Sequence, residues 1–308
     1  MRHKQEHRKK GYIYVILASS FFAMIGIISK MAMNTGLTPF MLLTYQYLFT
    51  IIFLSIWILA TDRKALLIDK KSIMLMAIQG VIGAFGTSLF FYLAITKISV
   101  GMSTMLLFLY PAVVNIYFGF SGVRKIGAAS IVALLSALMG SFMVLNIFGT
   151  EGFSISVIGI IFGICSCLAY AFYNIFADLK FSNFSPVIIS FYTAISAFIT
   201  SLIVSPSFFK FDVNFSWKLI GLFVLLALTS GIIPTILMYK GIKYIGADKA
   251  SIVASSELPM TIILAYFFLS EKMSIIQLLG VAAIVGSVVL LEKADRMAYN
   301  KLKASSKE

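Results

Sequence analysis

The sequence predicts an all-helical integral membrane protein with ten transmembrane helices, arranged as two inverted five-helix repeats with both termini in the cytoplasm. Three observations predict this fold class. The 308 residues are 60% hydrophobic and only 12% charged, whereas soluble domains have about a quarter of charged residues. The apolar residues fall into blocks of about 18–25, each long enough to cross about 30 Å of hydrocarbon. The second half of the chain repeats the pattern of the first.

Ten apolar blocks give the expected membrane spans in chain order. A basic tail at 1–10 precedes the first block, and a second basic tail at 292–308 follows the last. Strands of a membrane barrel would be about ten residues long with strict alternation, which these blocks lack. The expected spans are 11–29, 39–60, 72–96, 101–120, 126–147, 155–177, 186–207, 219–239, 250–269 and 274–291.

The net charge of +13 is explained by orientation in the membrane. With the N-terminus in the cytoplasm, the inside segments hold 20 of the 25 lysines and arginines. This bias is the positive-inside pattern, so it predicts that both termini are cytoplasmic. The same charges attract anionic headgroups, so membrane lipids are expected partners and nucleic acid is not. The inside segments are 1–10, 61–71, 121–125, 178–185, 240–249 and 292–308.

The two halves of the chain resemble one another at an offset of about 146 residues. Segments 97–140 and 243–286 both run from a lysine to a glycine 43 positions later, with a proline inside the first helix of each. The repeats extend over 11–147 and 155–291, with five expected spans each. An odd number of spans inserts the second repeat in the opposite orientation. Inverted repeats are typical of secondary transporters, although a duplicated bundle without transport would show the same pattern.

Glu257 is the first candidate for a functional residue. It lies two or three positions from the centre of span 250–269, about 4 Å along the helix axis. A carboxylate at that depth is costly unless it is paired, hydrated or protonated, and burial favours the protonated form. Glu257 is therefore expected to couple proton movement to transport or to hold a substrate ammonium group. The alternative is a structural acid that is hydrogen-bonded to neighbouring hydroxyls.

Pro259 predicts a break in the helix beside Glu257. Proline has no N–H, so the carbonyl of Ser255, four residues earlier, is expected to lose its helical partner. That carbonyl, the hydroxyls of Ser255 and Ser256, and Glu257 would form a polar cluster at mid-membrane. Broken helices are tolerated at this depth where they line a cavity.

Pro111 in the first half stands in the matching helix, directly after Tyr110. It is expected to free the carbonyl of Leu107 in the same way. A kink that only shapes packing would explain either proline alone. The pair at corresponding depths favours a cavity between the two broken helices, so Tyr110 and Pro111 join the candidate site.

One face of span 155–177 is polar and aromatic. Its hydroxyl, amide and ring groups recur at helical spacing and suit an amphiphilic organic ligand. We expect Tyr170 and Asn174 to line the substrate site, together with Tyr92 and Ser20. For Tyr173 the alternative is a tyrosine at the membrane interface. The face consists of Ser166, Ala169, Tyr170, Tyr173, Asn174 and Ala177, and the weaker candidates elsewhere are Gln79, Thr104, Asn115 and Pro234.

The sequence offers few groups for catalysis inside the membrane. His3 and His7 are both in the N-terminal tail, so no histidine is available for a metal site or a catalytic triad inside the membrane. No phosphate-binding loop of the Walker type is present, so ATP hydrolysis by this chain is not expected to drive transport. We therefore expect no cofactor, no metal and no enzymatic activity. The energy would come from a proton, another cation or the substrate gradient.

The segment Gly246–Leu291 resembles a known family. It runs from small residues through the acid-x-Pro of Glu257 and Pro259 to an apolar run, a Ser-Glu turn and a last helix with spaced glycines. This pattern resembles the EamA branch of the drug/metabolite transporter superfamily. The first half of the chain is similar but has Leu109 in place of the acid.

The resemblance implies two inverted five-helix repeats around a site lined by spans 1, 3, 4, 6, 8 and 9. It also implies export of amino acids, nucleosides, drugs or other small metabolites across the plasma membrane by alternating access. A monomer or a homodimer would suffice. Import or exchange by the same fold stays open, and so does a non-transporting membrane protein such as a sensor subunit or a lipid-facing enzyme. The resemblance does not name the substrate.

Overall fold

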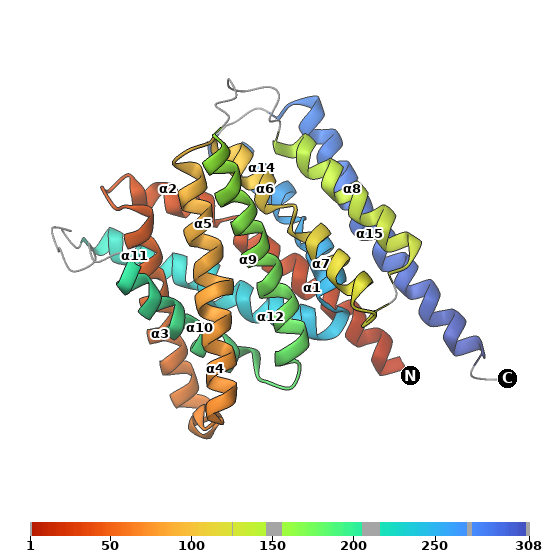
Figure 1. Ribbon diagram of the computed structural model, residues 1–308, viewed down its shortest axis with the longest axis horizontal. Coiled ribbons are helices and arrows are strands. Elements are labelled where there is room, and N and C mark those ends of the chain that lie inside the picture. The colour runs from red at the N-terminus through yellow and green to blue at the C-terminus, as the bar shows by residue number, and fades with distance from the viewer. Residues whose placement is uncertain (1, 125, 146–155, 205–215, 270–272, 306–308) are drawn as a thin grey trace.

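The computed structural model describes residues 2–124, 126–145, 156–204, 216–269 and 273–305. All regular secondary structure in these ranges is helical, as the apolar blocks predict. The helices pack against one another in a bundle (Figure 1). Nine helical segments within these ranges are long and apolar enough to cross a membrane. This agrees with the prediction of a helical membrane protein.

The nine segments correspond to nine of the ten predicted spans, and the remaining one is 250–269. That span consists of two short helices, α13 (Ala247–Ala254) with 8 residues and α14 (Glu257–Leu269) with 13. Neither alone is long enough to cross about 30 Å of hydrocarbon. The nine segments are Glu6–Met33, Pro39–Thr61, Lys70–Ile95, Val100–Phe120, Ala128–Leu145, Val157–Phe181, Pro186–Val204, Trp217–Ile245 and Ile275–Ala298.

The helices follow the predicted spans closely, apart from their ends. The first half of the chain forms α1 (Arg2–Phe22), α2 (Ile25–Met33), α3 (Pro39–Thr61), η1 (Arg63–Leu66), α4 (Lys70–Ile78), η2 (Gln79–Phe85), α5 (Gly86–Ile95), α6 (Val100–Leu107), α7 (Tyr110–Phe120) and α8 (Ala128–Leu145). The second half forms α9 (Val157–Phe181), α10 (Pro186–Val204), α11 (Trp217–Leu226), η4 (Ala227–Ile232), α12 (Ile233–Ile245), α13, α14 and α15 (Ile275–Ser305). The first and last helices thus extend through most of the predicted tails.

Polar residues fix where several helices begin. Thr38 precedes α3, and its hydroxyl oxygen accepts the N–H of Met41 at 3.3 Å, while Pro39 stands where a missing N–H costs nothing. Ser156 and Ser216 cap α9 and α11 in the same way. Each cap satisfies a backbone donor that the helix itself cannot pair.

Three predicted spans are divided into two helices each. Pro111 and Pro259 stand in the first turns of α7 and α14, so the proline ends one helix and begins the next. The first span, 11–29, is divided at residues 23–24, between α1 and α2. No proline stands there, and no feature of the sequence predicts this third break.

Two spans contain a π-helical segment, in which the turn is wider than in an α-helix. η2 begins at Gln79 in the third predicted span, and η4 begins at Ala227 in the eighth, 148 positions later. The helix breaks at Phe108 and Ser255 are 147 positions apart. Both offsets are close to the 146 residues that separate the similar sequence segments.

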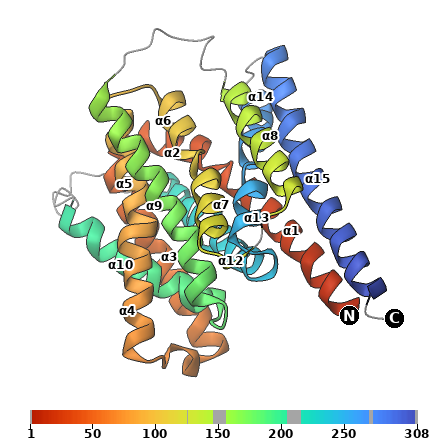
Figure 2. The ribbon, with the colours of Figure 1, turned by 45° about the vertical axis from the view of Figure 1, so that its right-hand side comes forward.

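Helices α8 and α15 form a closely packed pair along one side of the bundle (Figures 1 and 2). Gly140 and Gly280 meet where the two helices approach most closely, so neither position has room for a Cβ atom. The Ser136 hydroxyl also donates to the carbonyl of Ala283 at 3.1 Å. Small residues at such a crossing let two membrane helices touch through their backbones.

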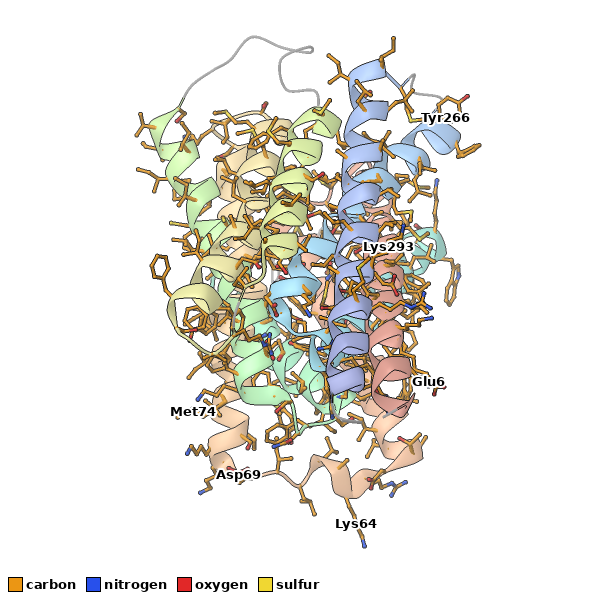
Figure 3. The ribbon with its side chains drawn as sticks, turned by 90° about the vertical axis from the view of Figure 1, so that its right-hand side faces the viewer. Glu6, Lys64, Asp69, Met74, Tyr266 and Lys293 are labelled. Atoms are coloured by element: carbon orange, nitrogen blue, oxygen red, sulfur yellow. The ribbon has the colours of Figure 1, made fainter. Side chains whose placement is uncertain are left out.

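The two ends of the bundle differ in their polar side chains. The start of α1 and the end of α15 lie at the same end of the molecule (Figure 1). Glu6, Lys64 and Asp69 lie toward that end, and Tyr266 lies toward the opposite one (Figure 3). Between the ends, α8 and α15 expose large apolar side chains, as helices that face lipid do.

Candidate functional site

The break between α13 and α14 places Glu257 at the start of a helix inside the bundle. Ser255 and Ser256 close the end of α13, and their N–H groups donate to the third carbonyl back at 3.2 and 3.0 Å. Their exposed fractions are 1% and 7%, so the break is buried in protein rather than exposed to lipid. The helix resumes at Glu257, whose side chain is partly exposed.

The polar character of the break comes from side chains and not from a free carbonyl. The carbonyl of Ser255 lacks the usual helical donor four residues on, as Pro259 predicts, but it is not free, because the N–H of Leu258 donates to it at 3.2 Å. The backbone turns tightly enough there for the third residue to replace the fourth as the donor. The buried atom without a hydrogen-bond partner is instead the hydroxyl oxygen of Ser256.

Two tyrosines lie close to Glu257. Tyr110 opens α7 and Tyr170 lies on α9, and their ring centroids are 4.3 Å apart. Glu257 lies within electrostatic range of the hydroxyl groups of both. Tyr110 also donates to the carbonyl of Ser251 on α13 at 3.3 Å. With the buried Pro111 beside Tyr110, these residues form a group that the sequence analysis proposed as part of one site.

Glu257 lacks a basic partner within the described part of the chain. The ion pairs found there use Asp178, Asp248 and Asp295 instead. A carboxylate beside two aromatic rings, with no counter-charge of its own, can bind a proton or an organic cation. The described residues as a whole contain no cluster of three histidine, cysteine or acidic side chains that could hold a metal ion.

A second buried polar group surrounds Gln79, at the first residue of η2. Its Nε2 donates to the carbonyl of Tyr173 at 2.9 Å and contacts the hydroxyl of Tyr239 at 3.4 Å. Gln79 is fully buried, and its Oε1 has no hydrogen-bond partner in the part of the chain that the structure describes. Tyr173 is buried in the main hydrophobic core cluster.

The two polar groups are adjacent on α9. The rings of Tyr170 and Tyr173 stack with centroids 6.1 Å apart, and those of Tyr173 and Tyr239 are 5.5 Å apart. A row of aromatic rings therefore connects the residues around Glu257 to the residues around Gln79. Tyr239 was not predicted, because no local pattern distinguishes it from residues that pack against other helices.

On α1, the residue that contacts the break is the neighbour of the predicted one. The hydroxyl of Ser20 donates to the carbonyl of Ile16 in its own helix at 2.9 Å. The hydroxyl of Ser19 donates instead to the carbonyl of Ala254, at the end of α13, at 3.3 Å. Adjacent residues differ by about 100° around a helix axis, so Ser19 and not Ser20 hydrogen-bonds to the break.

The other predicted candidates are spread around the bundle. Tyr92 packs edge-on against Phe40 with ring centroids 6.0 Å apart, in a cluster that also contains Tyr47. No hydrogen bond or ring contact in the described ranges joins it to Glu257. Asn174 donates to the carbonyl of Tyr170 at 2.8 Å, and its buried Oδ1 has no partner. Asn174 is therefore next to the site with one acceptor unused.

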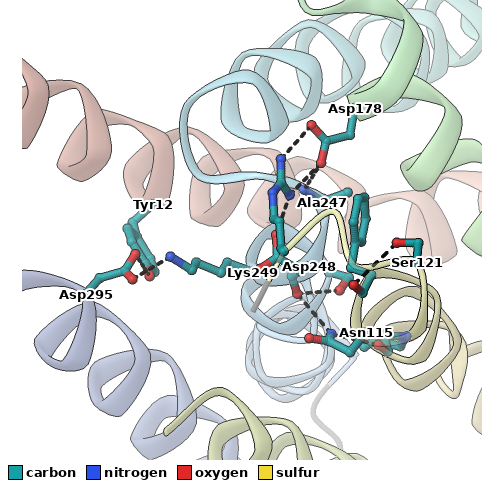
Figure 4. Close-up of polar contacts among 12 residues, drawn as sticks. Tyr12, Asn115, Ser121, Asp178, Ala247, Asp248, Lys249 and Asp295 are labelled. Carbon is teal, nitrogen blue, oxygen red and sulfur yellow. Dashed lines mark hydrogen bonds and ion pairs between the residues drawn. The ribbon is translucent and has the colours of Figure 1, made fainter. Parts of the chain in front are cut away.

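A charged cluster that sequence reasoning missed lies near the ends of α7 and α9 (Figure 4). Arg124, in the turn after α7, donates to both carboxylate oxygens of Asp178 at 2.7 and 3.0 Å, and to Asp248 at 2.6 Å. Arg124, Asp178 and Asp248 are called the Arg124 cluster here. The sequence analysis treated Arg124 only as a positive-inside charge, and its partners are 54 and 124 positions away.

The two carboxylates of the Arg124 cluster stabilise the charged guanidinium. Burial disfavours the charged guanidinium, but Asp178 and then Asp248 outweigh this effect and raise the pKa of Arg124 above its ordinary value. The guanidinium also stands 4.8 Å from the ring centroid of Phe118. A separate ion pair joins Lys249 on α13 to Asp295 on α15 (Figure 4).

Comparison with known proteins supplies the family. The pattern of the EamA-like transporter family matches residues 9–146 and 157–292, which together make up most of the chain. The chain belongs to the EamA-like transporter family. This family member is 26% identical to the "Uncharacterized transporter YcbK" of Bacillus subtilis over 311 residues, 97% of this chain and 96% of that one.

A second relative and one solved structure also match over nearly the full length of both chains. The family member is 26% identical to the "Uncharacterized inner membrane transporter YicL" of Salmonella typhimurium, over 94% of this chain and 97% of that one. One crystal structure matches with a TM-score of 0.77 over 95% of this chain and 98% of its own, at 15% identity, which shows the fold alone. Membership in a transporter family, together with nine apolar helices in the described ranges, makes the chain a multi-pass membrane protein.

Proposed function

We propose that this EamA-like protein is a secondary transporter that exports small organic metabolites, amino acids and related compounds or drugs, from the cell. Glu257 is the binding or coupling group of a central site that opens alternately to the two sides of the membrane. The observation that carries this proposal is a glutamate at a buried helix break, next to Tyr110 and Tyr170, whose carboxyl group has no ion-pair or hydrogen-bond partner among the described residues. A purely structural acid would be expected to have a basic or hydroxyl partner.

The elements around the site support a cavity shared between the two halves of the chain. Its polar and aromatic groups come from α1, η2, α7, α9, α12 and the α13–α14 break. These elements belong to predicted spans 1, 3, 4, 6, 8 and 9, the set that the family resemblance implies. A site built by both halves is what alternating access requires, since each half must be able to close it.

We further propose ten spans in two inverted repeats, over 11–147 and 155–291, with both termini in the cytoplasm of a cell whose plasma membrane holds the protein. The two π segments and the two proline breaks recur at nearly the same offset, and the family pattern matches each half separately. The divided α13–α14 segment is the ninth span.

The topology can be tested with reporter fusions at the two predicted sides. A green fluorescent protein fused after residue 308 is expected to fluoresce, and alkaline phosphatase at the same place is expected to be inactive. Both reporters inserted after residue 97, in the predicted outside loop, should give the opposite result. Active phosphatase at the C-terminus would contradict the proposed orientation.

Transport itself can be tested by flux through purified protein in liposomes. Labelled amino acids, nucleosides and cationic drugs would be measured for counterflow, with and without a pH gradient, against protein-free liposomes. We expect saturable flux of at least one class, accelerated by the gradient. Flux that runs equally well in both directions without a gradient would favour exchange, and flux coupled to proton entry together with the substrate would favour import. No flux for any compound would contradict the proposed substrate classes.

A further inference from the structure

The Arg124 cluster holds the N-terminal end of α13. Ala247 is the first residue of that helix, and its N–H donates to Asp178 at 2.9 Å. Gly246, the residue before it, has no side chain to cap the helix. Asp178 of α9 therefore supplies the cap from another helix, and Arg124 holds Asp178 there by two hydrogen bonds.

The backbone at Gly246 makes room for Arg124. Its φ of +86° is a conformation that L-residues with side chains rarely adopt. A Cβ atom at this position would lie 2.1 Å from an Nη atom of Arg124. The glycine thus permits both the turn into α13 and the approach of the guanidinium.

The cluster joins the two halves of the chain. Arg124 belongs to the first half, whereas Asp178 and Asp248 belong to the second. Asn115 on α7 adds another link by donating to the carbonyl of Asp248 at 3.0 Å. The side chains of Asp178 and Asp248 are only 10% and 6% exposed, while that of Arg124 is 33% exposed. The contact therefore stands at the edge of the protein interior, with Arg124 as its accessible member.

Helix α13 connects this cluster to the central site. Its N-terminal residues contact Arg124 and Asp178, and its C-terminal end is the break at Ser255 and Ser256 that precedes Glu257. The 8-residue helix is short and continuous, so a displacement of its N-terminus must be absorbed at the break. The break can act as a hinge, because residues at helix ends can change φ and ψ without disrupting a helical ladder.

We propose that the Arg124 cluster is a gate that closes the central site at the end of the bundle where the termini lie, and that α13 links its opening to Glu257. This gate rests on the proposed transport function, because it controls access to the same site. When Arg124 releases the two carboxylates, α13 loses the support of its cap and one of its ties to the first half, and the site becomes accessible from that end.

The gate can be tested by labelling a buried position between the cluster and the break. Ser251 is suitable because it is fully buried on α13. The two native cysteines, Cys165 and Cys167, would first be replaced by alanine so that maleimide can react only at the new position. The Ser251→Cys variant in that background would then be treated with a membrane-impermeant maleimide applied to either side of sealed vesicles. Arg124→Gln is expected to raise the labelling rate from the gate side at least about fivefold, the lower bound for a typical coupling between sites. Labelling from the other side should not rise.

A matched control removes a different charged contact of α13. Asp295→Asn removes the partner of Lys249, so it breaks the other ion pair of α13 and leaves the Arg124 cluster intact. We expect its labelling rate to stay at the level of the parent protein. An equal rise in both variants would overturn the gate, since general loosening of α13 would then explain the result.

A second variant and a second measurement keep the test valid if Arg124→Gln folds poorly. Arg124→Lys keeps the charge but cannot bind Asp178 through two parallel hydrogen bonds, and we expect a smaller rise in the same direction. Melting temperature in detergent would verify that each variant is folded. Folded variants whose labelling rates match the parent protein would overturn the proposal. The labelling needs no substrate, so failure of the gate is distinguishable from failure of the proposed transport function.

Discussion

Replacing Gly280 with alanine is expected to separate α8 from α15 and to destabilise the protein strongly. A Cβ atom at position 280 would lie 2.7 Å from the carbonyl oxygen of Gly140 and 2.7 Å from the backbone nitrogen of Val144. Both are backbone atoms, so no side chain can rotate away to make room. Overpacking of this kind costs about 1–3 kcal/mol, and the upper end applies where two backbones collide.

The measurement is the free energy of unfolding in mixed micelles titrated with a denaturing detergent, together with the yield of monodisperse protein. Gly286→Ala is the matched control, because Gly286 lies on the same helix and has no atom within 4 Å of an added Cβ. The control should be neutral or more stable by about 0.5–1 kcal/mol, as alanine favours helix over glycine. Equal stability of the two variants would contradict the close packing of α8 and α15.

Glu257→Gln is expected to abolish the acceleration of flux by a pH gradient and to leave counterflow measurable. Glutamine keeps the size and hydrogen-bonding capacity of the side chain, but it cannot bind and release a proton. Substrate exchange without net proton movement should therefore continue, while the gradient can no longer drive flux. Glu257→Asp retains a carboxyl group and should recover part of the gradient-driven flux.

The control for this variant is Glu292→Gln, which removes a carboxylate on α15 outside the site. Its flux is expected to match that of the parent protein. Gradient-driven flux that persists in Glu257→Gln would assign this glutamate to structure and not to coupling. Loss of both gradient-driven flux and counterflow would show that the carboxylate holds the substrate itself, through a charge that glutamine lacks.

Much of the fold follows from the sequence because hydrocarbon is a simple solvent. Each span must satisfy its own backbone hydrogen bonds, so apolar length alone indicates a helix. The prolines at 111 and 259 also predict two of the breaks. The break between α1 and α2 and the π segment at Gln79 lie in apolar sequence, and they depend on how neighbouring helices pack.

The sequence predicts which helices carry the candidate site better than it predicts which side chains contact one another there. Glu257 and Tyr170 stand out because charge and aromatic hydroxyls are costly in an apolar span. Ser19 was missed because the sequence does not fix the rotation of α1 to within one residue. The Arg124 cluster was missed because it joins residues far apart in the chain. The sequence has only 12 aspartates and glutamates, so Asp178 and Asp248 could have been examined as partners for a basic residue.

The divided span formed by α13 and α14 has a consequence for the order in which the chain is assembled. Asp248, Lys249 and Glu257 stand within 10 positions of one another, and charges of this kind resist transfer into lipid as the chain leaves the translocon. Arg124, the partner of Asp248, is already synthesised, but Asp295, the partner of Lys249, is not. This segment therefore depends on helices already in the membrane for its insertion. Its packing is complete only after α15 has been made and Asp295 can pair with Lys249.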